Sequence, residues 1–252
     1  MNSDNNFDQE YAPCCGLRSS SELKASAREH MFGYYGAAIG AGILVSFSTV
    51  CLTLMALIFT GGTGTLMGTF LYSAVSFVIS VVTGLFSSGF AYFYLKIVCG
   101  QYAVSGDVFY GFRFFPEKAL LVQFWLSLFA CLGDLPRFIL AARVTLSSGY
   151  DELLLYAASI LLSGIVPVIA SLFYGQAFFL LHDFPQYSAR ELLSASRRLM
   201  AGHKRKLLCL YLSFLPLMLL SLFSCGIAML WIIPCMNAAL AEFYLDLVRK
   251  SR

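Results

Sequence analysis

The chain has 252 residues, of which 59% are hydrophobic and only 12% are charged. Soluble globular domains are about a quarter charged, so this composition excludes an ordinary soluble domain. The net charge is only +3, and the positions of the charged residues are therefore more informative than their sum. The composition predicts an integral membrane protein.

The distribution of charge gives the first two predicted spans. No Lys, Arg, Asp or Glu occurs from Met31 to Leu95, a run of 65 residues. A helix rises about 1.5 Å per residue, so roughly 20 apolar residues cross a hydrocarbon core about 30 Å thick. The run is too long for one span and fits two, with a break at the glycine-rich segment 60–65. Because the segments are uniformly apolar and do not alternate, we expect helices and not the strands of a barrel.

Further apolar segments bring the predicted number of spans to six. The third span is interrupted by Asp134, Pro136 and Arg137, and the last two spans form a tight hairpin. We expect an all-α fold, a polytopic transmembrane helical bundle of three hairpins. Residues 1–30 are expected to form a cytosolic tail with an amphipathic segment, and 31–252 a single membrane domain. The predicted spans are Ala37–Phe59, Gly68–Leu95, Ala119–Leu140, Leu153–Leu181, Leu207–Ser224 and Ile227–Leu245.

The basic residues favour six spans with both termini in the cytosol. Of the 17 Lys and Arg residues, all but Arg137 and Arg143 fall in four segments: the N-terminal tail, the connections after spans two and four, and the C-terminus. Lys and Arg are enriched in cytosolic loops, so these four segments are expected on the cytosolic side of the cell membrane. The first thirty residues lack the apolar core of a cleavable signal peptide.

Two of these segments have the pattern of short helices that lie along lipid headgroups. Ser188 and Glu191 predict a capping box, in which each side chain accepts a hydrogen bond from the other residue's backbone N–H. Apolar and basic residues then fall largely on opposite faces, and Ser19 and Glu22 begin a similar segment. Such helices direct basic groups toward anionic lipid. The residues expected to contact headgroups are Arg190, Arg197, Arg198, Lys204, Arg205 and Lys206.

The two amphipathic segments also resemble each other at an offset of 169 residues. Over twelve positions, the segment that begins at Glu22 shares five identities with the one that begins at Glu191. The segment 107–118 occupies the equivalent place before the middle hairpin, without the same residues. We interpret this as a unit of amphipathic segment plus helical hairpin that is used three times. The alternative is convergent composition next to the membrane.

Few polar side chains fall within the predicted spans, and each must find a partner or reach the interface. Asp134 and Arg137 are three residues apart, so on a helix they can meet on one face near the outer end of span three. The functional interpretation is a solute or ion site. The favoured alternative is a helix end held by an ion pair, with Pro136 breaking the span. The possible polar or ion site comprises Asp134, Arg137, Gln123, Gln176 and Asn237.

A second polar group lies near the cytosolic end of the last span. Glu242 and Asp246 are four residues apart, and Asp246 can pair with Lys250 one turn later. We interpret them as an interfacial cluster whose side chains reach the headgroup region.

Small residues recur at helical spacing in the first two spans. They follow one side of span two, and span one contains Ala38-x-x-x-Gly42. Helices in lipid associate through close backbone contact, which small residues permit, so we interpret both stripes as packing surfaces. A hydrated path lined by the serines of span two is the alternative.

The sequence contains no recognisable catalytic, metal or nucleotide motif, so we expect no enzyme activity and no cofactor. His-Glu-x-x-His, Gly-x-Ser-x-Gly and the phosphate loop are all absent. His182 and Asp183 could form a general base and its orienting group, but chance adjacency at a helix end is the favoured interpretation. The basic segments are bracketed by spans, which suits membrane lipids and not nucleic acid.

Several segments together resemble a bacterial integral-membrane family. They are Ser188–Lys206 (SARELLSASRRLMAGHKRK), Trp231–Asn237 (WIIPCMN), Ala241–Leu247 (AEFYLDL) and the N-terminal Ser21–Lys24 (SELK). The family is catalogued as domain of unknown function 975. The resemblance covers most of the chain and implies a multi-pass cell-membrane protein, without implying an activity.

Three functions stay open at this point. We favour a non-enzymatic membrane module that assembles in the bilayer and engages lipid headgroups or a partner, either another membrane protein or a further copy of the chain. The alternative is a small-solute or ion transporter built from repeated hairpins, which would need a water-accessible polar cavity at the midplane. An intramembrane enzyme, the third, would need titratable groups clustered at one depth.

Overall fold

The structure is a computed structural model that describes residues 18–61, 66–141, 149–224 and 226–251. Over these ranges the chain is mostly helical and contains no strand, so the predicted all-α fold class is confirmed. Of the predicted N-terminal tail, only the part from Arg18 onward is described.

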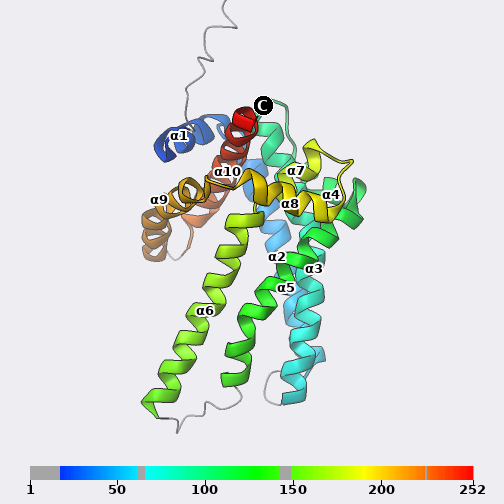
Figure 1. Cartoon of the computed structure of the whole chain (residues 1–252), viewed down its shortest axis with the longest axis vertical. Coiled ribbons are helices and arrows are strands. Elements are labelled where there is room, and N and C mark those ends of the chain that lie inside the picture. Colours follow the sequence, from blue (N-terminus) through cyan, green and yellow to red (C-terminus); the bar gives the residue numbers. More distant parts are fainter. Residues whose placement is uncertain (1–17, 62–65, 142–148, 225, 252) are drawn as a thin grey trace, which may run out of the picture.

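Four long helices form two hairpins that extend to one end of the molecule (Figure 1). The first hairpin is α2 (Tyr35–Phe59) with α3 (Leu66–Val98), and the second is α5 (Pro116–Ala141) with α6 (Tyr150–Tyr174). α3 contacts both α2 and α5, so it joins the two hairpins.

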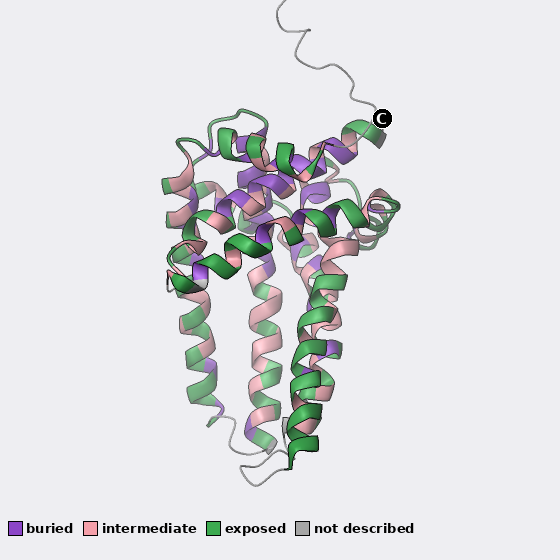
Figure 2. Cartoon of the chain, turned by 90° about the vertical axis from the view of Figure 1, so that its left-hand side faces the viewer, coloured by how far each residue is buried: buried purple, intermediate pink, exposed green. Residues whose placement is uncertain are grey.

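Short helical elements gather at the other end of the molecule, which we call the short-helix end (Figure 1). A third hairpin, of α9 and α10, stays in this half of the molecule, and the C-terminus lies there together with α1 (Figures 1 and 2). The elements concerned are α1 (Ser20–His30), η1 (Ser105–Phe109), α4 (Tyr110–Arg113), α7 (Ala177–Asp183), α8 (Ala189–Leu199), α9 (Lys204–Phe223) and α10 (Met229–Ser251).

Five helical stretches among the described residues are long and apolar enough to cross a membrane. They correspond to the predicted spans one, two, three, four and six. The predicted fifth span falls on α9, which begins with three basic residues and is not among the five. The predicted fourth span is divided into α6 and α7. The five stretches are Tyr35–Phe59, Met67–Val98, Pro116–Arg137, Tyr150–Asp183 and Met229–Lys250.

The favoured interpretation that Pro136 breaks span three was wrong. Pro136 lies inside α5, which continues to Ala141. Proline removes one backbone hydrogen bond, but helices at membrane depth tolerate this where neighbouring groups satisfy the freed carbonyl. Since the helix continues, Asp134 and Arg137 do share a face, and Arg137 Nε lies 3.4 Å from Asp134 Oδ1.

Both predicted capping boxes are confirmed. The backbone N–H of Ser19 donates to Glu22 Oε2 at 2.9 Å, and that of Glu22 donates to Ser19 Oγ at 3.3 Å. At the start of α8 the same two bonds join Ser188 and Glu191, at 2.8 and 3.4 Å. Two helices that are far apart in the sequence therefore begin with the same local structure.

The middle hairpin shares features with the other two. Asp107 Oδ2 accepts from the backbone N–H of Val104 at 3.0 Å, which is the carboxylate half of a capping box. A residue with left-handed backbone precedes the first helix of each hairpin: Gly33 (φ 90°), Phe115 (φ 53°) and Gly202 (φ 81°). These common features support the interpretation of a unit used three times.

Phe115 has a left-handed backbone that costs a residue with a Cβ about 1–2 kcal/mol. Glycine adopts this conformation freely. We therefore expect Phe115→Gly to be more stable than Phe114→Gly by about 1–2 kcal/mol in thermal unfolding in detergent. The neighbour is a matched control, because Phe114 is also exposed but has extended backbone with φ −116°. Equal stability of the two variants would contradict the backbone strain at Phe115.

The buried core lies at the short-helix end, whereas the far halves of the long helices are largely exposed (Figure 2). The apolar faces of α1 and α8 belong to this core: Leu23, Met31, Leu192 and Met200 are at most 2% exposed. These amphipathic helices therefore cover the end of the bundle with their apolar faces, which are not left for lipid. Large apolar side chains on the far halves, such as Phe47, remain exposed for lipid or a membrane partner.

Candidate functional site

Helix α10 carries two buried carboxylates on the face that packs against α1. Glu242 is 3% exposed and Asp246 is 9% exposed. They are four residues apart and therefore share one face of the helix. A buried carboxylate requires a counter-charge or several hydrogen-bond donors.

Arg18 supplies that counter-charge from the residue just before the α1 capping box. Its Nε lies 3.0 Å from both carboxylate oxygens of Asp246, and its Nη2 donates to Glu242 Oε2. The planar guanidinium suits this two-carboxylate contact. Burial alone would lower the pKa of Arg18, but the hydrogen bonds to Asp246 and Glu242 outweigh burial and raise it. Arg18 is thus held charged between the two carboxylates.

Two more groups from α1 complete this cluster. Ser26 Oγ donates to Glu242 Oε1 at 2.7 Å, and His30 Nδ1 lies 2.8 Å from the same oxygen. Glu242 and Asp246, which were expected to form an interfacial cluster, are therefore buried and pair with α1. Asp246 contacts Arg18 and not Lys250, with which it was expected to pair. We call Arg18, Ser26, His30, Glu242 and Asp246 the α1–α10 cluster.

The opposite face of α10 is fixed to α7. Tyr244, which is fully buried, donates its hydroxyl hydrogen to Asp183 Oδ2 and stacks on Phe179 with ring centroids 5.3 Å apart. His182 points elsewhere, and its Nε2 lies 2.8 Å from the carbonyl oxygen of Ser88 on α3. Because His182 and Asp183 have different partners, the structure supports chance adjacency and not a base with its orienting group.

The middle amphipathic segment packs on α3 through glycines. A Cβ placed on Gly89 would lie 1.7 Å from Val108 O, and one on Gly111 would lie 2.1 Å from Leu85 O. Lys96 Nζ also pairs with Asp107 Oδ2 at 2.8 Å. The backbone of η1 and α4 therefore lies directly against the backbone of α3, and only glycine permits this approach.

The small-residue side of α3 is a packing surface, as predicted. A Cβ on Gly84 would lie 2.3 Å from the Cβ of Gln123, and Ser80 Oγ lies 2.8 Å from Ser127 Oγ. These contacts join α3 to α5. The predicted stripe on α2 behaves differently, because a Cβ on Gly42 would meet nothing within 4 Å. Ala38 is 1% exposed, so packing within the chain explains Ala38 but not Gly42.

The residues of the predicted polar or ion site contact different neighbours. Asp134 pairs with Arg137 on its own helix, and both side chains are about half exposed. Gln123 lies against Gly84, whereas Asn237 lines a cavity beside α2 together with Tyr94. Gln176 is 1% exposed at the junction of α6 and α7, far along the chain from both. The structure brings Asp134 and Arg137 together and does not join the other three to them; a shared site stays a prediction.

The predicted headgroup residues lie on the outer side of α8 and at the start of α9. Arg190, Arg197 and Arg198 are exposed, opposite the buried apolar face of α8. Ser196 Oγ donates to the carbonyl of Phe173 in the last turn of α6, and Lys204 Nζ lies 3.7 Å from the centroid of the Phe173 ring. Figure 1 shows α8 crossing the bundle where α6 ends. The arginines of α8, which we call the α8 basic face, are thus held at the level at which the apolar helix α6 ends.

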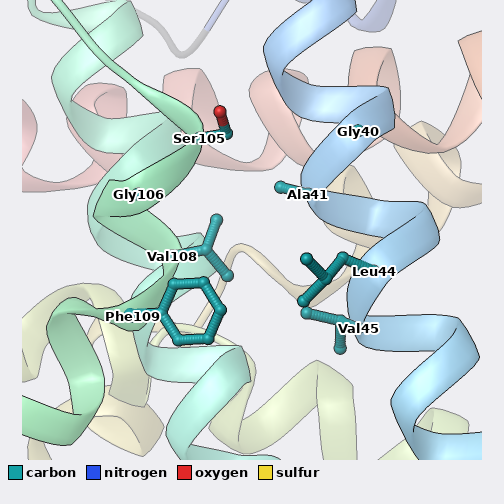
Figure 3. A pocket seen from close by; sticks show the side chains of 8 residues that line it. All are labelled: Gly40, Ala41, Leu44, Val45, Ser105, Gly106, Val108 and Phe109. Carbon is teal, nitrogen blue, oxygen red and sulfur yellow. The ribbon is translucent and has the colours of Figure 1, made fainter.

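Two cavities flank α2. The first, of about 330 Å³, lies between α2 and η1, and Figure 3 shows Val108 and Phe109 pointing toward Leu44 and Val45 across it. The second, of about 480 Å³, is a groove that α2 forms with α3 and α10, and we call it the α2–α10 groove. Apolar side chains line most of both cavities.

Sequence reasoning missed the pairing of Arg18 with Glu242 and Asp246. The positive-inside pattern placed Arg18 and the C-terminal end of the last span on one side of the membrane, and the two acidic residues share a helix face. These signals narrow the possible partners of the carboxylates. They do not select Arg18 among the basic residues on that side, because the choice depends on how α1 packs on α10.

The fold and its polar clusters define an all-α protein with five helical stretches in its described residues that are long and apolar enough to cross a membrane, in which Arg18 ties the start of α1 to two buried carboxylates of α10. Residues 17–251 match the family described as protein of unknown function (DUF975), and the chain belongs to this family. The resemblance found in the sequence is therefore confirmed. No curated protein and no solved structure matches the chain.

Proposed function

We propose that the protein is a non-enzymatic, multi-pass module of the cell membrane with both termini in the cytosol. Its α8 basic face holds anionic phospholipid headgroups of the cytosolic leaflet. The short-helix end is then the cytosolic end. The proposal rests on one observation: Leu192 and Met200 are fully buried in the bundle, while Arg190, Arg197 and Arg198 are exposed on the other side of the same helix.

A fixed basic face differs from a basic amphipathic helix that adsorbs to the membrane by itself. The bond from Ser196 to Phe173 and the buried side chains of Leu192 and Met200 hold α8 on the bundle, and the capping box fixes where the helix begins. The arginines are therefore already placed when lipid arrives, and little ordering entropy is lost on contact. Each basic side chain near an anionic surface contributes about 1 kcal/mol.

The exposed apolar surface supports assembly within the bilayer. Phe47 on α2, Ile58 and Phe59 at its end, and Leu154 and Leu161 on α6 are each at least 68% exposed. Lipid, another membrane protein or a further copy of the chain can cover this surface. A transporter would need a polar cavity at the midplane, and the cavities beside α2 are lined mainly by apolar side chains.

The test is lipid binding by native mass spectrometry of the protein in a neutral detergent. We expect the wild type to bind phosphatidylglycerol more tightly than phosphatidylcholine. The triple variant R190Q/R197Q/R198Q should lose at least fivefold in apparent affinity for phosphatidylglycerol, since three cations are removed. Phosphatidylcholine binding should not change.

A charge-preserving triple variant, R190K/R197K/R198K, is the control. It keeps the cations and changes only the shape of the headgroup contact, so it should bind phosphatidylglycerol nearly as the wild type does. The proposal fails if the glutamine variant keeps its affinity for phosphatidylglycerol while remaining folded by circular dichroism.

A further inference from the structure

The α2–α10 groove has the shape of a site for one chain of a lipid. On α2 its floor runs from Ala38 through Gly42 and Ser46 to Val50. Twelve residues of helix span about 18 Å, which is a little more than one leaflet of a hydrocarbon core about 30 Å thick. The groove therefore begins near the short-helix end of α2 and extends through one leaflet.

The width of the groove distinguishes a lipid chain from a helix. A cavity of about 480 Å³ over about 18 Å has a mean cross-section of about 27 Å². A helix with side chains is about 10 Å across, with a cross-section of about 80 Å², which is about three times the mean cross-section of the groove. A single acyl chain fits this width. Phe90 of α3 and Ile233 of α10 line the groove beside this floor.

The larger polar side chains of the groove, Tyr94 and Asn237, lie at one end of it, and Ser46 lies deeper, one turn before Val50. Asn237 and Tyr94 line the groove at the end nearest the short helices. The residues toward the other end, such as Val50 and Met229, are apolar. The larger polar side chains thus lie toward the short helices, and apolar side chains lie toward the other end. A phospholipid has the same order, because its ester groups lie at the boundary of the hydrocarbon core and its acyl chains lie within it.

A cation stands just beyond the polar end. Tyr35 lies one turn before Ala38, at the start of α2. Arg28 lies in the last turn of α1, and only four residues separate the end of α1 from the start of α2. The Arg28 side chain is exposed. A cation there complements the phosphate of an anionic lipid.

We infer that the α2–α10 groove binds one anionic phospholipid of the cytosolic leaflet. One acyl chain fills the groove, Tyr94 and Asn237 contact its ester region, and Arg28 contacts its phosphate. Small residues on α2 keep the floor open, since a Cβ on Gly42 would meet nothing within 4 Å. The site uses none of the residues of the α8 basic face; only its assignment to the cytosolic leaflet rests on the proposed function.

The test compares two glycine-to-leucine variants of α2. Gly42→Leu fills the groove, whereas Gly36→Leu adds the same volume to the same helix outside it; at both positions a Cβ meets nothing within 4 Å. Each protein is reconstituted with phosphatidylglycerol and phosphatidylcholine at 1:3, exchanged into detergent and weighed by native mass spectrometry. We expect the wild type and G36L to retain one phosphatidylglycerol. For G42L, the fraction of protein that carries this lipid should fall at least tenfold.

Two further variants refine the result. Ser46→Leu narrows the groove one turn deeper and should also release the lipid, which covers the case of a poorly folded G42L. Arg28→Gln should keep a lipid but lower the preference for phosphatidylglycerol over phosphatidylcholine about fivefold. R190Q/R197Q/R198Q should keep the groove lipid, so failure here and failure of the proposed function are distinguishable.

Three outcomes would overturn the inference. They are a wild type that emerges without lipid, a folded G42L and S46L that retain it, or a dimer that G42L abolishes. The last outcome would assign the groove to a second copy of the chain.

Discussion

Replacing Arg18 by alanine is expected to lower the free energy of unfolding by about 2–3 kcal/mol. The variant leaves Glu242 and Asp246 buried without their guanidinium partner. Breaking a fully buried ion pair costs about 3–5 kcal/mol, and the effect is smaller here because the Arg18 side chain is 29% exposed. The measurement is reversible unfolding in mixed detergent micelles.

The expected loss comes from uncompensated charge, and this can be shown by removing the carboxylates as well. The variant R18A/E242Q/D246N should recover most of the stability, since no buried charge then lacks a partner. Arg113→Ala is the control, because Arg113 is exposed and should change the stability by less than about 0.5 kcal/mol. A triple variant that is less stable than R18A would contradict the role of Arg18 as a counter-charge.

Replacing Gly89 by alanine is expected to destabilise the protein by about 3 kcal/mol. A Cβ at this position would lie 1.7 Å from Val108 O, a distance that real Cβ atoms essentially never show. The neighbouring atoms are backbone, so η1 must move away from α3 as a whole. Overpacking of this kind costs about 1–3 kcal/mol or more, which exceeds the gain of about 0.5–1 kcal/mol from removing a helical glycine.

Gly164→Ala is the matched control for this prediction. Gly164 also lies inside a long helix, but its Cβ would meet nothing within 4 Å, so the substitution should stabilise the protein by about 0.5–1 kcal/mol. Gly111→Ala probes the same contact from the other side, and it should destabilise the protein by about as much as Gly89→Ala does. If Gly89→Ala unfolds at the same temperature as Gly164→Ala, the backbone contact between α3 and η1 is wrong.

The long helices and the capping boxes could be predicted because their signals are local. Charge-free runs of membrane length predict α2 and α3, and four residues suffice for each capping box. The placement of α9 was harder to predict, because its composition alone does not determine whether it runs along the long helices. The structure keeps α9 in the half of the molecule that holds the short helices (Figures 1 and 2).

The polar clusters could be predicted only in part, since they depend on contacts between distant segments. Arg18 and Asp246 are 228 positions apart, and their contact requires the packing of α1 on α10. Asp134 and Arg137 are close in sequence, and their pairing was predictable from helix geometry. The stripe of small residues on α2 has the same local pattern as a packing surface, and only the surrounding helices show that it lines a groove.

The position of α8 at the membrane surface tests the proposed function most directly. A spin label on a cysteine at Ser194, in a chain without its other cysteines, would stand among the exposed arginines of α8. In vesicles of phosphatidylglycerol and phosphatidylcholine, we expect collisions with oxygen and with a water-soluble nickel complex to place the label at headgroup depth. Its mobility should rise when phosphatidylglycerol is replaced by phosphatidylcholine. A label that is fully water-exposed and indifferent to lipid charge would contradict the proposal.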